Sequence, residues 1–278
     1  MSPDEYCRDK AAASGSSFYY AFMFLPPERR RAITALYAFC REVDDIVDEA
    51  TDPGLARTRL AWWHGEIANL FAGRPQHPVT RALAPALGPF GIRAERLNEV
   101  ITGMEMDLAQ TRYPDFAALE RYCYHVAGVV GMLAAGIFGY TNPGTLEYAR
   151  RLGTAFQLTN IIRDVGDDAR RNRIYLPMDE LRAFGVAAAD ILAARGGTAF
   201  ERLMEFQYRR AVRYYEEALA ALPQEDRRAQ LPGLIMARIY RALLEEIERD
   251  GFRRVLTHRT SLTPLRKFWL ACATWARA

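Results

Sequence analysis

The amino-acid sequence predicts an all-α fold, and three observations support this. Apolar residues recur every three or four positions, alternation with a period of two is almost absent, and Pro, Asp and Gly punctuate the chain at helical lengths. Of the 278 residues, 50% are hydrophobic and 26% are charged, an ordinary globular balance. Because no linker, low-complexity stretch or internal repeat divides the chain, we expect a single domain over residues 1–278.

The punctuation places the boundaries of roughly eight to ten expected helices. Proline is favoured at the first helical position, aspartate and asparagine cap the helix start, and glycine follows the helix end. The expected helix starts are, in chain order, Pro26-Pro27, Asp52-Pro53, Asp115 and Asn142-Pro143, and Gly251 is expected to end the helix that contains Tyr240.

The first of these helices carries carboxylates on its apolar face. At about 100° per residue, Ile33, Tyr37 and Cys40 lie within roughly a quarter-turn of Asp44 and Asp48. The apolar stripe therefore continues directly into aspartates. We expect these two carboxylates to point into the protein.

A second segment, from Gln157 to Asp168, has the same arrangement. On one continuous helix, Gln157, Asn160, Asp164 and Asp168 lie within about 80° of one another. Two inward carboxylate clusters cannot remain unpaired in one bundle, because desolvation and mutual repulsion would return their protons. We therefore expect a multivalent positive partner between the two clusters.

Magnesium ions that bridge a diphosphate fit this pattern. Mg²⁺ keeps several waters and is typically held by one or two carboxylates together with substrate phosphates. Bound metal neutralises the diphosphate oxygens as a C–O bond breaks. Arg41 lies about 60° from Asp44, and Arg163 adjoins Asp164, so either guanidinium could add a bidentate contact to phosphate. An isolated Asp pair is usually a solvated helix face, but two copies on apolar stripes favour a site.

Other chemistries have weaker support in the sequence. A di-iron bundle needs Glu-x-x-His pairs, and the chain contains none. Nucleophilic catalysis is poorly supported because the four histidines, His64, His77, His125 and His258, are scattered. The glycines between Tyr122 and Tyr140 indicate close approach by a helix or an apolar ligand; with no preceding strand they do not form a nicotinamide fingerprint.

Charge, cysteine content and hydropathy limit the partners and the location. The net charge of +3 is too small to argue for nucleic acid, and the four isolated cysteines fit a reducing cytoplasm. The N-terminus is unlike a signal peptide, and the apolar run Val126 to Tyr140 is below the roughly 18 to 20 residues that span a bilayer. We expect a soluble cytoplasmic protein. The stretch Arg266 to Leu270 is either a peripheral anchor at the inner membrane surface or, as we favour, a packed final helix. The oligomeric state does not follow from the sequence.

At the acidic motifs the sequence resembles the squalene and phytoene synthase family, which joins two prenyl diphosphates head to head. The resemblance covers nearly the whole chain and is highly specific. It is carried by Ser14 to Phe18, Tyr37 to Arg41, Asp44 to Asp48, Tyr122 to Gly128, Asn160 to Asp168 and Arg173 to Pro177.

The resemblance implies an isoprenoid-synthase helical bundle around a central apolar cavity, and a role for each matching residue. The implied magnesium-binding residues are Asp44, Asp48, Asn160, Asp164 and Asp168. Those implied to contact diphosphate or order the site are Ser17, Arg41, Gln157, Arg163, Arg173, Tyr175 and, near the C-terminus, Arg254. Those implied to line the cavity near the reacting carbons, where an aromatic face can stabilise a carbocation, are Phe18, Tyr37, Tyr122 and Tyr240. Independently of the resemblance, Phe18 and Phe22 lie one turn apart if their segment is helical, and we expect them to limit the cavity depth.

Within this family, residues 14–49 are most similar to the bacterial hopanoid-associated presqualene diphosphate synthases. That similarity implies two farnesyl diphosphates as substrates, magnesium as cofactor and no NADPH. Phytoene synthase, dehydrosqualene or squalene synthase and hydroxysqualene synthase share these motifs and stay open as alternatives. A chain-elongating prenyltransferase or terpene cyclase fits the second motif less well. A non-catalytic prenyl-lipid binding protein would need the cavity but not two carboxylate pairs.

Overall fold

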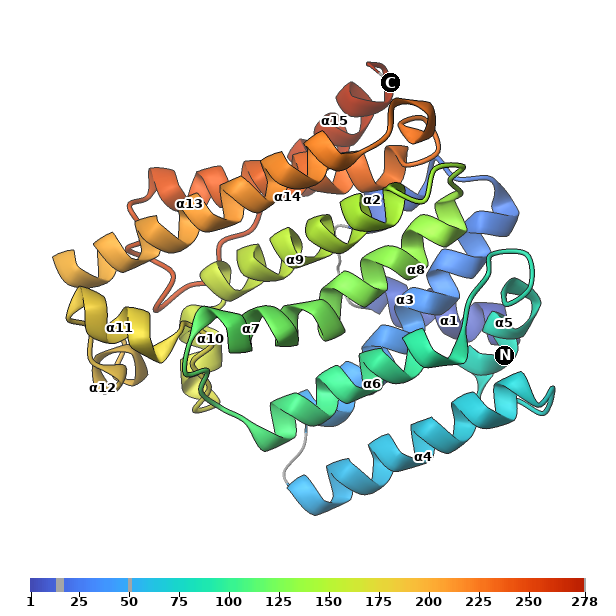
Figure 1. Cartoon of the computed structure of the whole chain (residues 1–278), viewed down its shortest axis with the longest axis horizontal. Helices are drawn as coiled ribbons and strands as arrows, with labels where there is room; N and C mark the ends of the chain where they lie inside the picture. The colour runs from blue at the N-terminus through green and yellow to red at the C-terminus, as the bar shows by residue number, and fades with distance from the viewer. Residues whose placement is uncertain (14–17, 50–51, 278) are drawn as a thin grey trace.

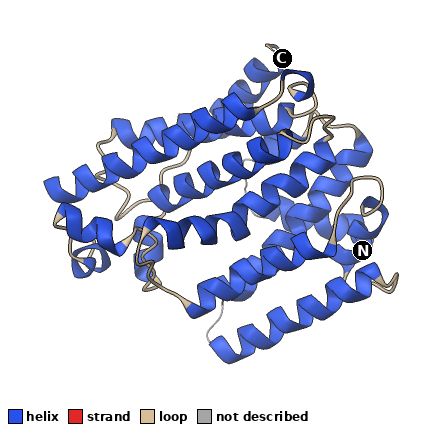
Figure 2. Ribbon diagram, viewed as in Figure 1, coloured by secondary structure: helices blue, strands red, loops and turns tan. Residues whose placement is uncertain are grey.

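The computed structural model describes residues 1–13, 18–49 and 52–277, and within these ranges the protein is helical (Figure 1). No strand forms in the described residues, where an isolated bridge between Arg112 and Ile174 is the nearest approach to a sheet (Figure 2). The all-α prediction is confirmed.

The helices of the N-terminal half are α1 (Pro3–Ala13), α2 (Phe18–Phe22), α3 (Pro27–Asp48), α4 (Pro53–Phe71), α5 (Pro78–Leu83), α6 (Ala94–Ala109), α7 (Phe116–Cys123) and α8 (Val129–Phe138). Those of the C-terminal half are α9 (Thr145–Arg163), α10 (Val165–Arg170), α11 (Met178–Phe184), α12 (Ala188–Leu192), α13 (Thr198–Ala221), α14 (Leu231–Arg249) and α15 (Pro264–Trp275). Two 3₁₀ turns, Ala84–Ala86 and Gln224–Asp226, and the π-helical turn Tyr124–Gly128 complete the described helical structure.

The centre of the bundle is enclosed mainly by five helices, α3, α6, α8, α9 and α14. α9 packs against α8, α13 and α14, while α3 packs against α6 and α8. α4 and α5 cover the outer side of α3, and α15 lies on α14 next to α2. The long helices α3, α9 and α14 therefore present their inner faces to a shared interior.

Most of the expected boundaries are confirmed by capping geometry. α3 begins at Pro27, and α4 begins after Asp52, whose Oδ1 accepts a hydrogen bond from Gly54 N at 2.7 Å. Asp115 Oδ1 accepts from Ala118 N at 2.8 Å, and Gly251 follows α14 with a φ of +66°. The fifteen α-helices of the described residues outnumber the expectation because several, such as α10 and α12, are single short turns.

The glycines between Tyr122 and Tyr140 allow two helices to approach closely. A Cβ on Gly131 of α8 would lie 2.3 Å from Ala149 O, and one on Gly153 of α9 would lie 2.3 Å from Ala127 O. These backbone contacts confirm close helix packing at Gly131. The same glycine also lines the central cavity, and approach by an apolar ligand there stays a prediction.

The stretch Phe116–Phe138 is long and apolar enough, by length and composition, to cross a membrane. Half of the residues in the most apolar part of this stretch are buried inside the protein, where α7 and α8 pack against α6 and α9. It is interrupted by the π-helical turn Tyr124–Gly128. These contacts are those of a core helix.

Candidate active site

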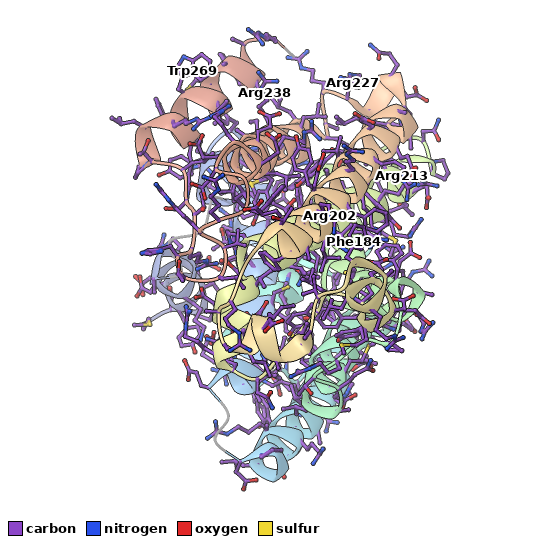
Figure 3. The ribbon with its side chains drawn as sticks, turned by 90° about the vertical axis from the view of Figure 1, so that its left-hand side faces the viewer. Phe184, Arg202, Arg213, Arg227, Arg238 and Trp269 are labelled. Atoms are coloured by element: carbon purple, nitrogen blue, oxygen red, sulfur yellow. The ribbon has the colours of Figure 1, made fainter. Side chains whose placement is uncertain are left out.

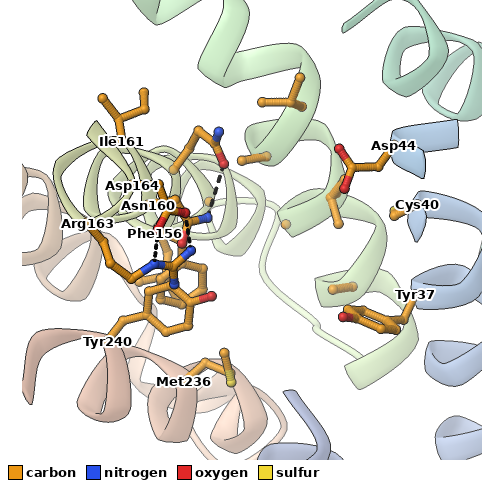
Figure 4. Close-up of a pocket in the computed structure, with 18 of the residues that line it drawn as sticks. Tyr37, Cys40, Asp44, Phe156, Asn160, Ile161, Arg163, Asp164, Met236 and Tyr240 are labelled. Carbon is orange, nitrogen blue, oxygen red and sulfur yellow. Dashed lines mark hydrogen bonds and ion pairs between the residues drawn. The ribbon is translucent and has the colours of Figure 1, made fainter. Parts of the chain in front are cut away.

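A cavity of about 980 Å³ lies between α3, α6, α8, α9 and α14 (Figure 4). Its volume is at the upper end of the range of roughly 300 to 1,000 Å³ found for ligand sites. The N-terminal halves of α3 and α9 contribute apolar side chains such as Ile33, Leu36 and Leu152, and the C-terminal ends contribute carboxylates. The cavity therefore has a polar mouth and an apolar interior.

The first acidic motif lies on the cavity wall formed by α3. Asp44 and Asp48 both line the cavity, as the sequence predicted. Arg41 donates to Asp44 Oδ2 at 2.5 Å and also pairs with Asp45. Burial, followed by the negative charge of Asp48, raises the pKa of Asp44 to about 7. In the absence of a cation this carboxyl is therefore poorly suited to stay ionised.

The second motif faces the first across the cavity, but it does not form one continuous helix. α9 ends at Arg163, Asp164 has φ −103° and ψ 12°, and α10 begins at Val165. The prediction of an unbroken helix through Asp168 was wrong. The break lets Gly166 N donate to Val255 O at 2.9 Å, and a Cβ on Gly166 would lie 2.2 Å from Leu256 O.

Despite the break, the three polar residues of the second motif point into the same space. Asn160, Asp164 and Asp168 all line the cavity. Figure 4 shows Asn160 and Asp164 across the cavity from Asp44. The end of α9 and the start of α10 thus place these three side chains on the same side, as the sequence predicted for one continuous helix.

Arginines pair with the motif carboxylates Asp164 and Asp48. Asp164 accepts from Arg163 at 2.5 Å and from Arg259 at 3.0 Å. Asp48 accepts from Arg173 at 3.1 Å and forms an ion pair with Arg171 at 3.0 Å, which joins α3 to the segment after α10. Each of these guanidiniums can turn to a phosphate oxygen when a cation takes its carboxylate.

Asp168 is the exception among the four motif carboxylates. Within residues 1–13, 18–49 and 52–277 no ion pair reaches its carboxylate. Burial, followed by the charges of Asp164 and Asp107, raises the pKa of Asp168 to about 8. The positive charge of a divalent cation at this position would oppose that rise and favour the ionised carboxylate.

The donor set at the cavity mouth fits magnesium bound together with phosphate. Asn160 Oδ1 is buried and has no hydrogen-bond partner, so it has an acceptor site to offer. Among the described residues no three His, Cys, Asp or Glu side chains converge to hold a metal by themselves. Mg²⁺ sites of this kind are completed by waters and substrate phosphates.

Two tyrosines at the cavity wall share one buried carboxylate that the sequence reasoning missed. Tyr122 OH and Tyr175 OH each donate to Asp107 at 2.8 Å, and their rings stack with centroids 5.2 Å apart. Burial raises the pKa of Asp107 to about 6, against the opposing effect of the two tyrosine hydrogen bonds. The signal was present on α6, where Val100, Met104 and Asp107 lie on one helical stripe.

The remaining predicted residues on the cavity wall surround its middle and its apolar end. Tyr37 and Tyr240 line the cavity, and the Tyr240 ring packs on Phe156 at 4.8 Å. Gln157 Oε1 accepts from Asn160 Nδ2 at 3.3 Å. At the apolar end Phe22 contacts Phe138, with ring centroids 6.4 Å apart.

Three predicted residues are not found on the described cavity wall. Arg254 is exposed and pairs with Asp250 at 3.3 Å, while Arg259 and Lys267 reach the cavity instead. The segment between α14 and α15 is irregular, so helical spacing could not indicate which arginine turns inward. Ser17 lies outside the described residues, and of Phe18 only the backbone, at the start of α2, is described.

The fold and the cavity define an all-helical isoprenoid-synthase architecture with an acidic mouth. The family model for squalene/phytoene synthase matches residues 11–266, and the chain belongs to this family. Members of the family are prenyltransferases that condense isoprenyl diphosphates. A phytoene synthase from Arthrospira platensis is 38% identical over 264 residues, covering 89% of this chain and 84% of that protein.

Two solved structures extend the comparison. The crystal structure of a dehydrosqualene synthase in complex with ligand superposes with a TM-score of 0.87 at 28% identity, covering 99% of this chain and 96% of that chain. The crystal structure of squalene synthase HpnC from Alicyclobacillus acidocaldarius superposes with a TM-score of 0.78, also at 28% identity, covering 90% of this chain and 94% of that chain. The predicted isoprenoid-synthase fold is confirmed.

Proposed function

We propose that this protein condenses two farnesyl diphosphates to presqualene diphosphate with release of one diphosphate. The observation that carries the proposal is the acidic and arginine-rich mouth above an apolar cavity whose far end is closed by Phe22 and Phe138. The mouth suits a diphosphate, and the interior suits prenyl chains. The cavity volume of about 980 Å³ leaves room for more than one chain.

Ionisation is the first chemical requirement. The C–O bond of one farnesyl diphosphate breaks, diphosphate leaves with the bonding electrons, and an allylic cation remains. Magnesium held by Asp44, Asp48, Asn160, Asp164 and Asp168 would supply Lewis-acid stabilisation of the leaving diphosphate. Once Asp164 and Asp48 hold magnesium, their partners Arg163 and Arg173 are free to donate to oxygens of the leaving diphosphate. These contacts hold the diphosphate at the mouth.

Carbon–carbon bond formation follows inside the apolar part of the cavity. The double bond of the second farnesyl diphosphate attacks the cation, and loss of a proton closes a cyclopropane. The product keeps one diphosphate. Tyr37 and Tyr240 lie on the wall between the mouth and the interior, where their rings can stabilise positive charge on carbon.

The proton has two candidate acceptors. Released diphosphate is one. The other is Tyr122, whose hydroxyl can accept a proton on oxygen while it donates its own to Asp107, 2.8 Å away. Asp107 is the one carboxylate in contact with both Tyr122 and Tyr175 among the described residues, so it also fixes the orientation of the two rings.

Phytoene synthesis from two geranylgeranyl diphosphates is the second candidate function. The name of the Arthrospira platensis relative favours it, whereas the names of the two solved structures favour a farnesyl substrate. Phe22 and Phe138 at the apolar end limit the length of chain that the cavity accepts, which supports the shorter substrate.

Product analysis separates the candidates. The purified protein is incubated with magnesium and either farnesyl or geranylgeranyl diphosphate, with and without NADPH, and the products are identified by mass spectrometry. We expect presqualene diphosphate from farnesyl diphosphate in both arms, with one diphosphate released per product. A preference for geranylgeranyl diphosphate, or NADPH-dependent squalene formation, would contradict the substrate assignment. Binding of prenyl diphosphate without magnesium-dependent diphosphate release would identify a lipid-binding protein instead.

A further inference from the structure

Helix α15 exposes an apolar face to solvent. Leu265, Phe268, Trp269 and Trp275 have exposed fractions of 82%, 46%, 62% and 55%. At about 100° per residue these four residues lie within roughly 120° of one another, so they form one stripe. Figure 3 shows Trp269 at the margin of the molecule (Figure 3). Leu270, on the opposite face of α15, and Ala271, at the edge of the stripe, are buried against the bundle.

A second element extends this surface. α15 packs next to α2, and the ring of Trp275 stacks on Phe24 with centroids 5.8 Å apart. Met23, the residue before Phe24, is 37% exposed. An exposed face that combines tryptophan, phenylalanine, leucine and methionine on two neighbouring elements marks an interaction surface rather than scattered apolar residues.

The segment that carries the stripe is basic. Residues 251–278 contain six Arg or Lys and no Asp or Glu. Carboxylates outside this segment pair with four of the six: Glu246 with Arg266 at 2.8 Å, Asp250 with Arg254 at 3.3 Å, Glu201 with Arg253 at 3.8 Å and Asp164 with Arg259 at 3.0 Å. Arg277 has no ion pair among the described residues, and the segment itself carries only positive charge, so its flank attracts an anionic surface.

The same helix also borders the site. Lys267, in the first turn of α15, and Leu262, just before it, both line the cavity. One side of this segment therefore faces the proposed prenyl chains, and the other side carries the exposed stripe. A surface that receives or releases long apolar chains would meet the protein here.

We infer that α15 docks the protein on the surface of a bilayer that contains anionic lipids, with Leu265, Phe268, Trp269 and Trp275 entering the interface and the basic flank facing the headgroups. Tryptophan is enriched at membrane interfaces, and an apolar helix face with basic residues is typical of peripheral anchoring. The stripe fits a bilayer better than a second copy of this chain, because a partner copy would bring the same positive charge to the contact.

Vesicle flotation of the full-length protein tests the inference. We expect binding to phosphatidylcholine vesicles that contain about one third phosphatidylglycerol, and much weaker binding to pure phosphatidylcholine. Raising the ionic strength shortens the Debye length from about 10 Å at 0.1 M to about 3 Å at 1 M, so the bound fraction should fall. Equal binding to both vesicle types at all salt concentrations would overturn the inference.

Two sets of variants assign the binding to α15. The double variant Leu265→Ser/Trp269→Ser should weaken vesicle binding by about ten-fold or more, because it removes the two most exposed apolar side chains of the stripe. The double variant Arg253→Gln/Arg277→Gln keeps the stripe and should weaken binding by about five-fold per arginine. Trp62→Ser removes a tryptophan of α4 that is 47% exposed and should leave binding unchanged.

Circular dichroism melting shows whether each variant is folded, and the arginine variant keeps the test valid if the stripe variant does not fold. Unchanged binding by a folded stripe variant would overturn the inference. So would light scattering that finds a wild-type dimer and a monomeric stripe variant without vesicle binding, since a second copy would then cover the face. The docking test does not depend on which prenyl diphosphate the protein uses.

Discussion

Two regions of the protein bury carboxylates in opposite ways. Asp226, between α13 and α14, accepts hydrogen bonds from Thr141 N, Thr141 Oγ1, Asn142 N and Thr145 Oγ1 at 2.6 to 3.0 Å. Burial alone would raise its pKa, but these hydrogen bonds lower the pKa to about 2. At the cavity mouth, Asp168 has no ion pair among the described residues and its pKa is raised to about 8.

The difference separates a structural carboxylate from one that awaits a ligand. Asp226 is 2% exposed and its charge is fully satisfied by the loop that it holds. The aspartates at the mouth repel one another, and the arginines that pair with Asp44, Asp48 and Asp164 leave Asp168 without an ion pair among the described residues. A protein gains no stability from such an arrangement, so its explanation lies in what the site binds.

The largest expected effect comes from removing charge at the mouth. Asp44→Asn and Asp168→Asn should each lower turnover by about a hundred- to a thousand-fold, because each removes a ligand that positions the leaving diphosphate. The measurement is magnesium-dependent diphosphate release at saturating substrate. Asp190→Asn is the matched control, since its side chain pairs with Arg195 at the surface and does not line the cavity. Near-normal turnover in Asp168→Asn would contradict the metal-site assignment.

The next largest effect is on the free energy of unfolding, and it should have opposite signs for Asp226 and for Asp168 at the cavity mouth. Asp226→Ala leaves the backbone N–H groups of Thr141 and Asn142 without their acceptor and should lower the free energy of unfolding by about 3 kcal/mol. Asp168→Asn should leave the metal-free protein as stable or more stable, because it removes repulsion. Urea unfolding measures both free energies. An equal loss of stability in the two variants would contradict the distinction between a structural carboxylate and a ligand-binding one.

A smaller effect concerns pH. The pKa of Asp226 is lowered from 3.8 to about 2 in the folded protein, so its contribution is present above pH 3.8 and is lost as the pH falls through 2. Wild type should therefore lose more stability than Asp226→Ala over this interval. Urea midpoints measured at several pH values provide the test, and parallel curves for the two proteins would count against the assignment.

The smallest expected effect is on substrate length. Phe22→Ala should deepen the apolar end and raise the use of geranylgeranyl relative to farnesyl diphosphate by about ten- to two-hundred-fold. Competition between the two substrates, read out by mass spectrometry, measures the ratio. Phe71→Ala changes an exposed phenylalanine of α4 and should leave the ratio unchanged. An unchanged ratio in Phe22→Ala would place the length limit elsewhere.

Local periodicity predicted the features that depend on one helix. The inward direction of Asp44 and Asp48 follows from the stripe of α3, and the same test applied to α6 would have indicated Asp107. The break at Asp164 was not predictable in this way, because it depends on a backbone contact between Gly166 and Val255, far apart in the sequence. The exchange of Arg254 for Arg259 at the mouth has a similar origin, since the segment before α15 has no repeating geometry.

The most direct test of the account is whether magnesium and diphosphate stabilise the protein cooperatively. Melting temperatures are measured for wild type and Asp168→Asn with magnesium alone, diphosphate alone and both. If the mouth binds them as one cluster, the wild-type shift with both should exceed the sum of the separate shifts, and this excess should vanish in Asp168→Asn. Additive shifts in wild type, or the same excess in Asp168→Asn, would contradict a shared magnesium–diphosphate site between α3 and α9.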